Sequence, residues 1–214
     1  MDKTVYIVGG DWGQDFQNMF EERGWQVVRR FEDASFIQFT GGEDVDPSLY
    51  GEQNTHSGFN RNRDAEEGWF FNRAREEGKN MLGVCRGGQF LTVMSGHKMW
   101  QDVDNHGLWG THEATHLDSG DTYQVTSTHH QMMKPVEGSS PYKILVAAGL
   151  TSFKQGGGSL QEQDPEDNKR DIEAVFYPDT KALAFQPHPE YVSSSEDCNK
   201  LYFRLIEECF GGKG

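Results

Sequence analysis

The stretch NMLGVCRGGQFLTVMSG (80–96) changes its pattern at its centre. Residues 81–84 form a short apolar run that is typical of a buried strand, whereas residues 89–94 carry apolar side chains at helical spacing. Cys85 stands at the junction of the two patterns. The stretch therefore predicts a strand that turns sharply into a helix, with a cysteine at the corner.

Strand-like and helix-like segments alternate through the first half of the chain. Strands are expected at 4–8, 25–28, 36–40 and 80–85, and helices around 16–20 and over 64–77, the latter with Asp64 as its N-cap. Strands separated by helices of this length predict an α/β fold, a parallel sheet with helices on both faces. The second half adds strands at 121–127, 142–147, 172–177 and 181–186, and closes on a helix around 196–209. The length of the chain predicts a single domain over residues 1–214.

Composition argues against several classes of function. The chain has 214 residues, a formal net charge of −14 and three cysteines. Binding to nucleic acid or to an anionic membrane surface requires clustered Lys and Arg, so neither is expected. The sequence shows no signal-peptide pattern and no run of roughly 20 apolar residues that would span a membrane. An odd number of cysteines predicts free thiols, and hence a cytoplasmic protein.

The glycines around Cys85 suggest a nucleophile at a strand-to-helix corner. Gly83 and Gly87 lie two residues to either side, as in the G-x-nucleophile-x-G elbow, with cysteine in the place of serine. The N-terminus of the following helix and the Arg86 side chain would both favour the thiolate, and the Arg86 backbone N–H would face a tetrahedral oxyanion. The motif alone fits a buried structural cysteine equally well.

His188 is the best candidate for the base that such a cysteine needs. It follows a predicted strand in the segment AFQPHPEY, between Pro187 and Pro189. The prolines hold the segment extended, so that His188 and Glu190 would project to the same side, with the carboxylate near the imidazole.

Residues 112–116 read HEATH and match the H-E-x-x-H pattern of zinc proteases. That chemistry needs both histidines on one face of a stable helix. Glycines at 107 and 110 and the turn-forming segment 118–121 make a helix here unfavourable. No calcium loop is indicated either, and we expect neither a metal nor a cofactor.

Together these motifs resemble a known family. GVCRGGQ (83–89) and HPE (188–190) resemble the class I glutamine amidotransferases, which use a Cys-His-Glu triad on a flavodoxin-like, mostly parallel α/β sheet. Three further segments resemble the γ-glutamyl hydrolase branch, peptidase family C26, which includes γ-glutamyl-γ-aminobutyrate hydrolases. They are GGEDVDPSLYGE (41–52), the Arg63-Asp64 pair followed by Glu66, and STHHQ (127–131).

The resemblance implies a role for each matching residue. Cys85 would attack the γ-carbonyl of a small-molecule γ-glutamyl substrate, and the N–H groups of Gly42 and Arg86 would bind the oxyanion. His188, oriented by Glu190, would protonate the leaving amine and then activate water. The residues implied in substrate binding are Gln89, Ser127, Thr128 and His129.

Two departures from the family pattern leave the substrate open. Pro187 stands where the family usually shows an aromatic residue, and residues 149–170 resemble an insertion. The chain could hydrolyse glutamine or a γ-glutamyl amine, or act as a glutaminase subunit that delivers ammonia to a separate synthetase. A non-catalytic binding or regulatory protein on the same fold is the alternative from a different class.

Overall fold

The computed structural model describes residues 1–9, 13–107, 110–149, 152, 154–156, 170–191 and 195–212. Most of the segment 149–170 lies outside these residues, so the insertion expected there stays a prediction. No helix in the described part of the chain is long and apolar enough to cross a membrane.

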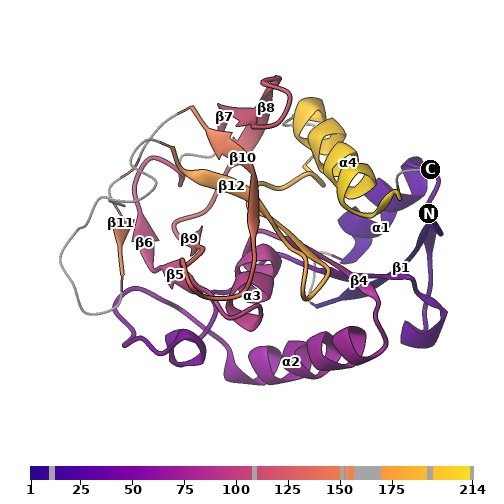
Figure 1. Ribbon diagram of the computed structural model, residues 1–214, viewed down its shortest axis with the longest axis horizontal. Helices are drawn as coiled ribbons and strands as arrows, with labels where there is room; N and C mark the ends of the chain where they lie inside the picture. Colours follow the sequence, from indigo (N-terminus) through magenta and orange to yellow (C-terminus); the bar gives the residue numbers. More distant parts are fainter. Residues whose placement is uncertain are drawn as a thin grey trace.

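The elements follow the predicted alternation (Figure 1). The helices are α1 (Gly13–Glu22), α2 (Arg61–Glu76), α3 (Arg86–Met94) and α4 (Glu196–Phe210), with the short 3-10 helices η1 (Phe31–Asp33) and η2 (Pro47–Tyr50). The strands of the first half are β1 (Thr4–Val8), β2 (Gln26–Val27), β3 (Phe36–Phe39), β4 (Asn80–Val84), β5 (Lys98–Trp100) and β6 (Asp102–Val103). Those of the second half are β7 (Gly110–His116), β8 (Thr122–Ser127), β9 (Met132–Lys134), β10 (Lys143–Ala148), β11 (Lys154–Gln155), β12 (Ile172–Tyr177) and β13 (Ala182–Phe185).

A nine-stranded sheet forms the centre of the described structure, in the order β2-β1-β3-β4-β13-β12-β10-β7-β8. The five strands from β2 to β13 run parallel to their neighbours. From β13 onward each strand pairs antiparallel with the next. Phe39 pairs with Gly83 and Val84 pairs with Phe185, so β3, β4 and β13 end at one edge of the sheet. The predicted α/β fold is confirmed, and ligands of such sheets bind at this carboxyl edge.

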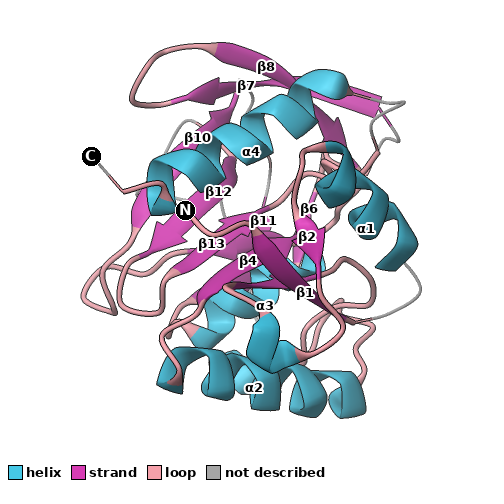
Figure 2. Ribbon diagram, turned by 90° about the vertical axis from the view of Figure 1, so that its right-hand side faces the viewer, coloured by secondary structure: helices cyan, strands magenta, loops and turns pink. Residues whose placement is uncertain are grey.

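Helices cover both faces of the sheet, as Figure 2 shows. Neighbouring residues of β4 supply the two cores, because successive side chains of a strand point to opposite faces. Leu82 packs in the core that α1 and α4 complete with Phe20 and Leu201. Met81 packs in the other core, to which α2 and α3 contribute residues such as Phe71 and Phe90.

The N-terminus of α2 corrects one prediction. The helix starts at Arg61, where the side-chain oxygen of Asn60 accepts hydrogen bonds from the N–H groups of Asn62 (3.1 Å) and Arg63 (3.3 Å). Asp64 is therefore not the N-cap. Its carboxylate lies in the first turn and pairs with Arg86, a long-range contact that local sequence rules do not reveal.

Candidate active site

Cys85 occupies the corner between β4 and α3, at φ 50° and ψ −115°. A positive φ is uncommon for any residue with a side chain, so this corner is strained. The backbone of Cys85 is held on both sides, since its N–H donates to the Phe185 carbonyl (2.8 Å) and its carbonyl accepts from the Gln89 N–H (3.0 Å). The predicted strand-to-helix turn is therefore confirmed, with the Cys85 side chain 8% exposed.

Glycine is required on both sides of this corner because the backbone packs too closely for a side chain. A Cβ on Gly83 would lie 2.5 Å from the carbonyl oxygen of Gly87. A Cβ on Gly87 would overlap the carbonyl group of Phe39 on the adjacent strand. Neither obstacle is a flexible side chain, so the two glycines allow α3 to start directly against the sheet.

His188 and Glu190 follow β13 and form a buried hydrogen-bonded pair. The Nδ1 atom of His188 lies 2.6 Å from Oε1 of Glu190, and both residues are 8% exposed. The backbone N–H of His188 donates to Oγ1 of Thr126 at 2.7 Å. This bond fixes the segment between Pro187 and Pro189 to the end of β8.

Four neighbours define the surroundings of the His188 imidazole. Tyr191 stacks on it with ring centres 4.5 Å apart and planes 5° apart. On another side, a Cβ at Gly41 would lie 2.8 Å from the Cε1 atom of His188. Burial lowers the pKa of His188, but the charge and hydrogen bond of Cys85, together with Glu190, outweigh burial and raise it. The protonated imidazole is thus stabilised beside Cys85.

Gly41 and Gly42 follow β3, at the same sheet edge as Cys85. Arg63 holds their turn from α2, because its Nη2 donates to the carbonyl oxygens of Gly41 (2.8 Å) and Thr40 (3.1 Å). Gly42 has φ 133°, and a Cβ there would overlap the Arg63 guanidinium. The implied oxyanion turn is therefore built around an arginine that the sequence identified only as part of a family motif.

Arg86 corrects a second prediction. Its guanidinium is 1% exposed and forms ion pairs with Asp64 and Glu67. Burial and the neighbouring Arg63 lower the pKa of Arg86 to about 10. Because two carboxylates offset its charge, the Arg86 side chain is not the group that favours a thiolate. The implied role of Arg86 in the site is therefore that of its backbone N–H, as an oxyanion donor.

The two acids that follow the Arg63-Asp64 pair differ in burial. Glu66 is exposed on α2. Glu67, one residue later, is 1% exposed and accepts from Nε of Arg63 at 2.9 Å. A buried network of Arg63, Glu67 and Arg86 thus connects the Gly41–Gly42 turn to α3.

The residues implied in substrate binding lie near the sheet edge that carries Cys85. Several of their polar atoms form hydrogen bonds to other groups of the protein. Nε2 of Gln89 donates to the carbonyl of Gln131 (3.2 Å) and to Oε1 of Gln186 (3.4 Å). Oγ of Ser127 donates to the carbonyl of His106 at 2.9 Å. Oγ1 of Thr128 is buried and has no hydrogen-bond partner within the described part of the chain.

His129 is buried beside another histidine. Its Nδ1 lies 2.9 Å from the Gln131 carbonyl, and its ring stacks on His106 with centres 4.5 Å apart. Burial, together with the nearby histidines, lowers its pKa well below the usual value. His129 is therefore a neutral imidazole, and its Nε2 has no hydrogen-bond partner among the residues that the structure describes.

The HEATH segment lies on strand β7, where an extended backbone puts its two histidines roughly 13 Å apart, too far to share one metal ion. His116 pairs with Glu208 at 2.9 Å, whereas His112 pairs with Glu173 at 2.8 Å. His112, His106 and Glu173 form a cluster that could hold a metal ion. This cluster was not predicted from the sequence, since 61 residues separate His112 from Glu173 and no spacing motif joins them.

The sequence of the chain matches a known protein family and its members. Residues 26–190 match the peptidase C26 family. The glutamine amidotransferase-like protein YvdE of Lactococcus lactis is 30% identical over 190 residues, which cover 79% of this chain and 72% of YvdE.

Solved structures share the fold at low sequence identity. PurLQS from Thermotoga maritima aligns with a TM-score of 0.65 at 14% identity, covering 97% of this chain and 99% of that one. A GMP synthase subunit from Thermoplasma acidophilum aligns with a TM-score of 0.61 at 14% identity, over 99% of this chain and 96% of that one. The expected class I glutamine amidotransferase-like fold is confirmed. With the match over residues 26–190, the chain belongs to the peptidase C26 family.

Proposed function

We propose that the protein hydrolyses a γ-glutamyl amide bond, in glutamine or in a γ-glutamyl amine, through a γ-glutamyl thioester on Cys85. Family membership supports an amide hydrolase or amidotransferase in general. The observation that carries the finer proposal is the strained Cys85 corner beside the buried His188–Glu190 pair. A cysteine nucleophile needs a base that is oriented by a third group, and this pair meets that need.

In the first half of the reaction the Cys85 thiolate attacks the γ-carbonyl carbon. The carbonyl oxygen becomes an oxyanion, to which the N–H groups of Gly42 and Arg86 would donate. His188, protonated and held by Glu190, gives its proton to the amide nitrogen as the C–N bond breaks. Ammonia or the free amine leaves, and the glutamyl group stays on sulfur as a thioester.

In the second half water replaces the amine. Neutral His188 takes a proton from the water as its oxygen attacks the thioester carbon, and the C–S bond then breaks. Glutamate leaves, and Cys85 and the protonated His188 are restored. The raised pKa of His188 supports this cycle, because the protonated imidazole is the form that the first half requires.

Two alternatives use the same site. The protein could be a glutaminase subunit that delivers ammonia to a separate synthetase, an idea favoured by its structural likeness to a GMP synthase subunit. It could also bind a γ-glutamyl ligand without turnover. The buried Thr128 hydroxyl and the His129 Nε2 atom, which have no partner among the described residues, are polar atoms that a ligand could satisfy in either case.

The first experiment measures amine release from glutamine and from a panel of γ-glutamyl amides, with the wild type, Cys85→Ala and Cys209→Ala. Cys209 is the matched control, since it is a free thiol and burial raises its pKa to about 12. We expect turnover that Cys85→Ala abolishes and Cys209→Ala leaves unchanged. Equal turnover in both variants would contradict the thiol mechanism.

A glutamine-mimicking electrophile separates the alternatives when purified protein shows no turnover. Labelling at Cys85, located by mass spectrometry of the intact chain and its peptides, would favour a subunit that awaits its synthetase. The absence of labelling would favour a binding protein and would exclude the proposed nucleophile.

A further inference from the structure

A second cluster of functional side chains lies on the antiparallel half of the sheet, outside the Cys85 site. His106 follows β6, His112 lies on β7 and Glu173 lies on β12. Nε2 of His112 lies 2.8 Å from Oε1 of Glu173, and Nδ1 of His106 lies 3.7 Å from the same oxygen. The side chains of His106 and Glu173 are fully buried, and that of His112 is 10% exposed.

Asp171 determines which nitrogen of His106 faces Glu173. Nε2 of His106 lies 2.8 Å from Oδ2 of Asp171, so the proton belongs on Nε2 and the lone pair on Nδ1. Nδ1 therefore turns its lone pair toward the Glu173 carboxylate. Among the described residues, neither Nδ1 of His106 nor Oε2 of Glu173 has a hydrogen-bond partner, although both atoms are buried. Two unpartnered acceptors in one buried cluster need a cation or a proton.

The charge balance of the cluster also favours a cation. Asp171 and Glu173 are both fully buried carboxylates, and the described neighbour of opposite charge is Lys154, with Nζ 2.8 Å from Oδ1 of Asp171. With neutral histidines the cluster carries one excess negative charge, which is costly in a buried site.

We propose that His106 Nδ1, His112 Nε2 and the Glu173 carboxylate bind a divalent transition-metal ion of the zinc class. Two imidazoles and one carboxylate are a ligand set that suits zinc and its neighbours, and their ligand atoms already lie within 4.8 Å of one another. Asp171 would act as the outer carboxylate that orients a ligating histidine. This inference departs from the expectation that the chain binds no metal.

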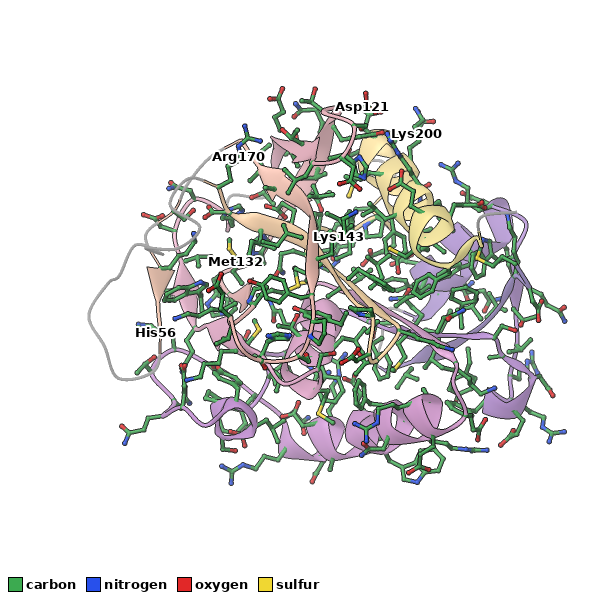
Figure 3. The ribbon with its side chains drawn as sticks, in the orientation of Figure 1. His56, Asp121, Met132, Lys143, Arg170 and Lys200 are labelled. Carbon is green, nitrogen blue, oxygen red and sulfur yellow. The ribbon has the colours of Figure 1, made fainter. Side chains whose placement is uncertain are left out.

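The site would connect to the substrate segment without taking part in the chemistry at Cys85. Ser127 donates to the His106 carbonyl at 2.9 Å, and the His129 ring stacks on the His106 ring. A metal bound to His106 would therefore fix residues 127–129. Asp171 and Glu173 follow closely after Arg170, which is labelled in Figure 3.

The test is metal binding by the full chain, purified without a histidine tag and stripped with a chelator. Zn²⁺ is measured by equilibrium dialysis with elemental analysis, and Co²⁺ by its visible absorption bands, which report the ligand geometry. We expect one tightly bound ion per chain. His112→Gln keeps a donor for Glu173 but removes the imidazole, and Glu173→Gln keeps the shape but removes the charge. Each is expected to weaken binding by about tenfold or more.

His116→Gln is the matched control, because His116 lies on the same strand and also pairs with a carboxylate. We expect it to bind Zn²⁺ like the wild type, and Zn²⁺ to raise the melting temperature of both. No saturable binding by folded wild-type chain would overturn the proposal. So would binding that His112→Gln and Glu173→Gln leave unchanged, since the ion would then sit elsewhere. If one of these two variants fails to fold, the proposal is tested by Zn²⁺ binding of the other variant and by the ligand geometry in the Co²⁺ spectrum of the wild type.

Discussion

Nη2 of Arg63 donates to the carbonyl oxygen of Gly41 at 2.8 Å, and this bond joins helix α2 to the turn that follows β3. The same guanidinium donates through Nε to Glu67, which in turn pairs with Arg86 next to Cys85. One buried network therefore holds both the Gly41–Gly42 turn, with its implied oxyanion donor, and the start of α3, which directly follows Cys85. Arg63 acts here as a positioning residue.

Replacing Arg63 should reduce turnover more than substrate affinity. In Arg63→Gln the Gly41–Gly42 turn loses its main hydrogen bonds, and a displaced oxyanion donor typically costs about 10²-fold in rate. We expect kcat to fall by that order with KM changed little. Steady-state kinetics on the best γ-glutamyl substrate measure both. Arg75→Gln, exposed on the same helix, is the control and should leave both constants unchanged. A change confined to KM would instead identify Arg63 as a substrate ligand.

Glu190→Gln should lower the pKa of His188. The folded pKa is raised above the usual value near 6.5, and Glu190 contributes to the increase through its hydrogen bond and its charge. A raised pKa stabilises the folded state below about pH 6.5, and this stabilisation is lost as pH rises through the folded pKa. Without the carboxylate, His188 should deprotonate at lower pH and kcat should fall by about 10²–10⁴.

The pKa of His188 can be followed by NMR of the imidazole resonances. Glu196→Gln, an exposed acid in the first turn of α4, is the control and should leave the titration of His188 where it is in the wild type. An unchanged titration in Glu190→Gln would show that Cys85 alone sets the protonation state of His188.

The parts of the fold that the sequence predicted well depend on local pattern. The strand 81–84, the glycines around Cys85 and the prolines around His188 are all readable within a few residues, and the corner and the segment after β13 follow from them. That residues 112–116 form no helix was also predictable, because glycines and a turn surround the motif.

The predictions that failed concern contacts between residues far apart in the sequence. Asp64 matched an N-cap by composition, but its partner Arg86 lies on another helix, and Asn60 caps α2 instead. Glu66 and Glu67 cannot be distinguished in the sequence until the face of α2 that packs on α3 is known. The proximity of His106 to Glu173 likewise depends on how β7, β10 and β12 are ordered in the sheet.

Arg86→Met should destabilise the fold strongly. The substitution leaves the buried carboxylates of Asp64 and Glu67 without their main partner, and breaking a buried ion pair in this way typically costs about 3–5 kcal/mol. Urea unfolding followed by circular dichroism measures the loss. Arg73→Met is the matched control on α2, since Arg73 pairs with the more exposed Glu32 and Glu77 and should cost far less. Equal losses in the two variants would show that Asp64 and Glu67 are protonated in the folded protein.

Gly87→Ala and Gly68→Ala should have opposite effects, although both glycines lie in helices. A Cβ on Gly87 would overlap the Phe39 carbonyl group, so α3 would have to move away from the sheet. We expect a loss of at least about 3 kcal/mol in unfolding free energy, together with the loss of turnover, because the Cys85 corner moves with the helix.

In the described structure no atom lies within 4 Å of where a Cβ on Gly68 in α2 would be, so alanine there meets no obstacle among these residues. Alanine also restricts the unfolded chain and favours helix, which should raise the unfolding free energy by about 0.5–1 kcal/mol. Thermal melts of both variants, with turnover assayed in parallel, provide the comparison. Wild-type stability and turnover in Gly87→Ala would mean that α3 does not need its close approach to β3, and that the strained corner has another origin.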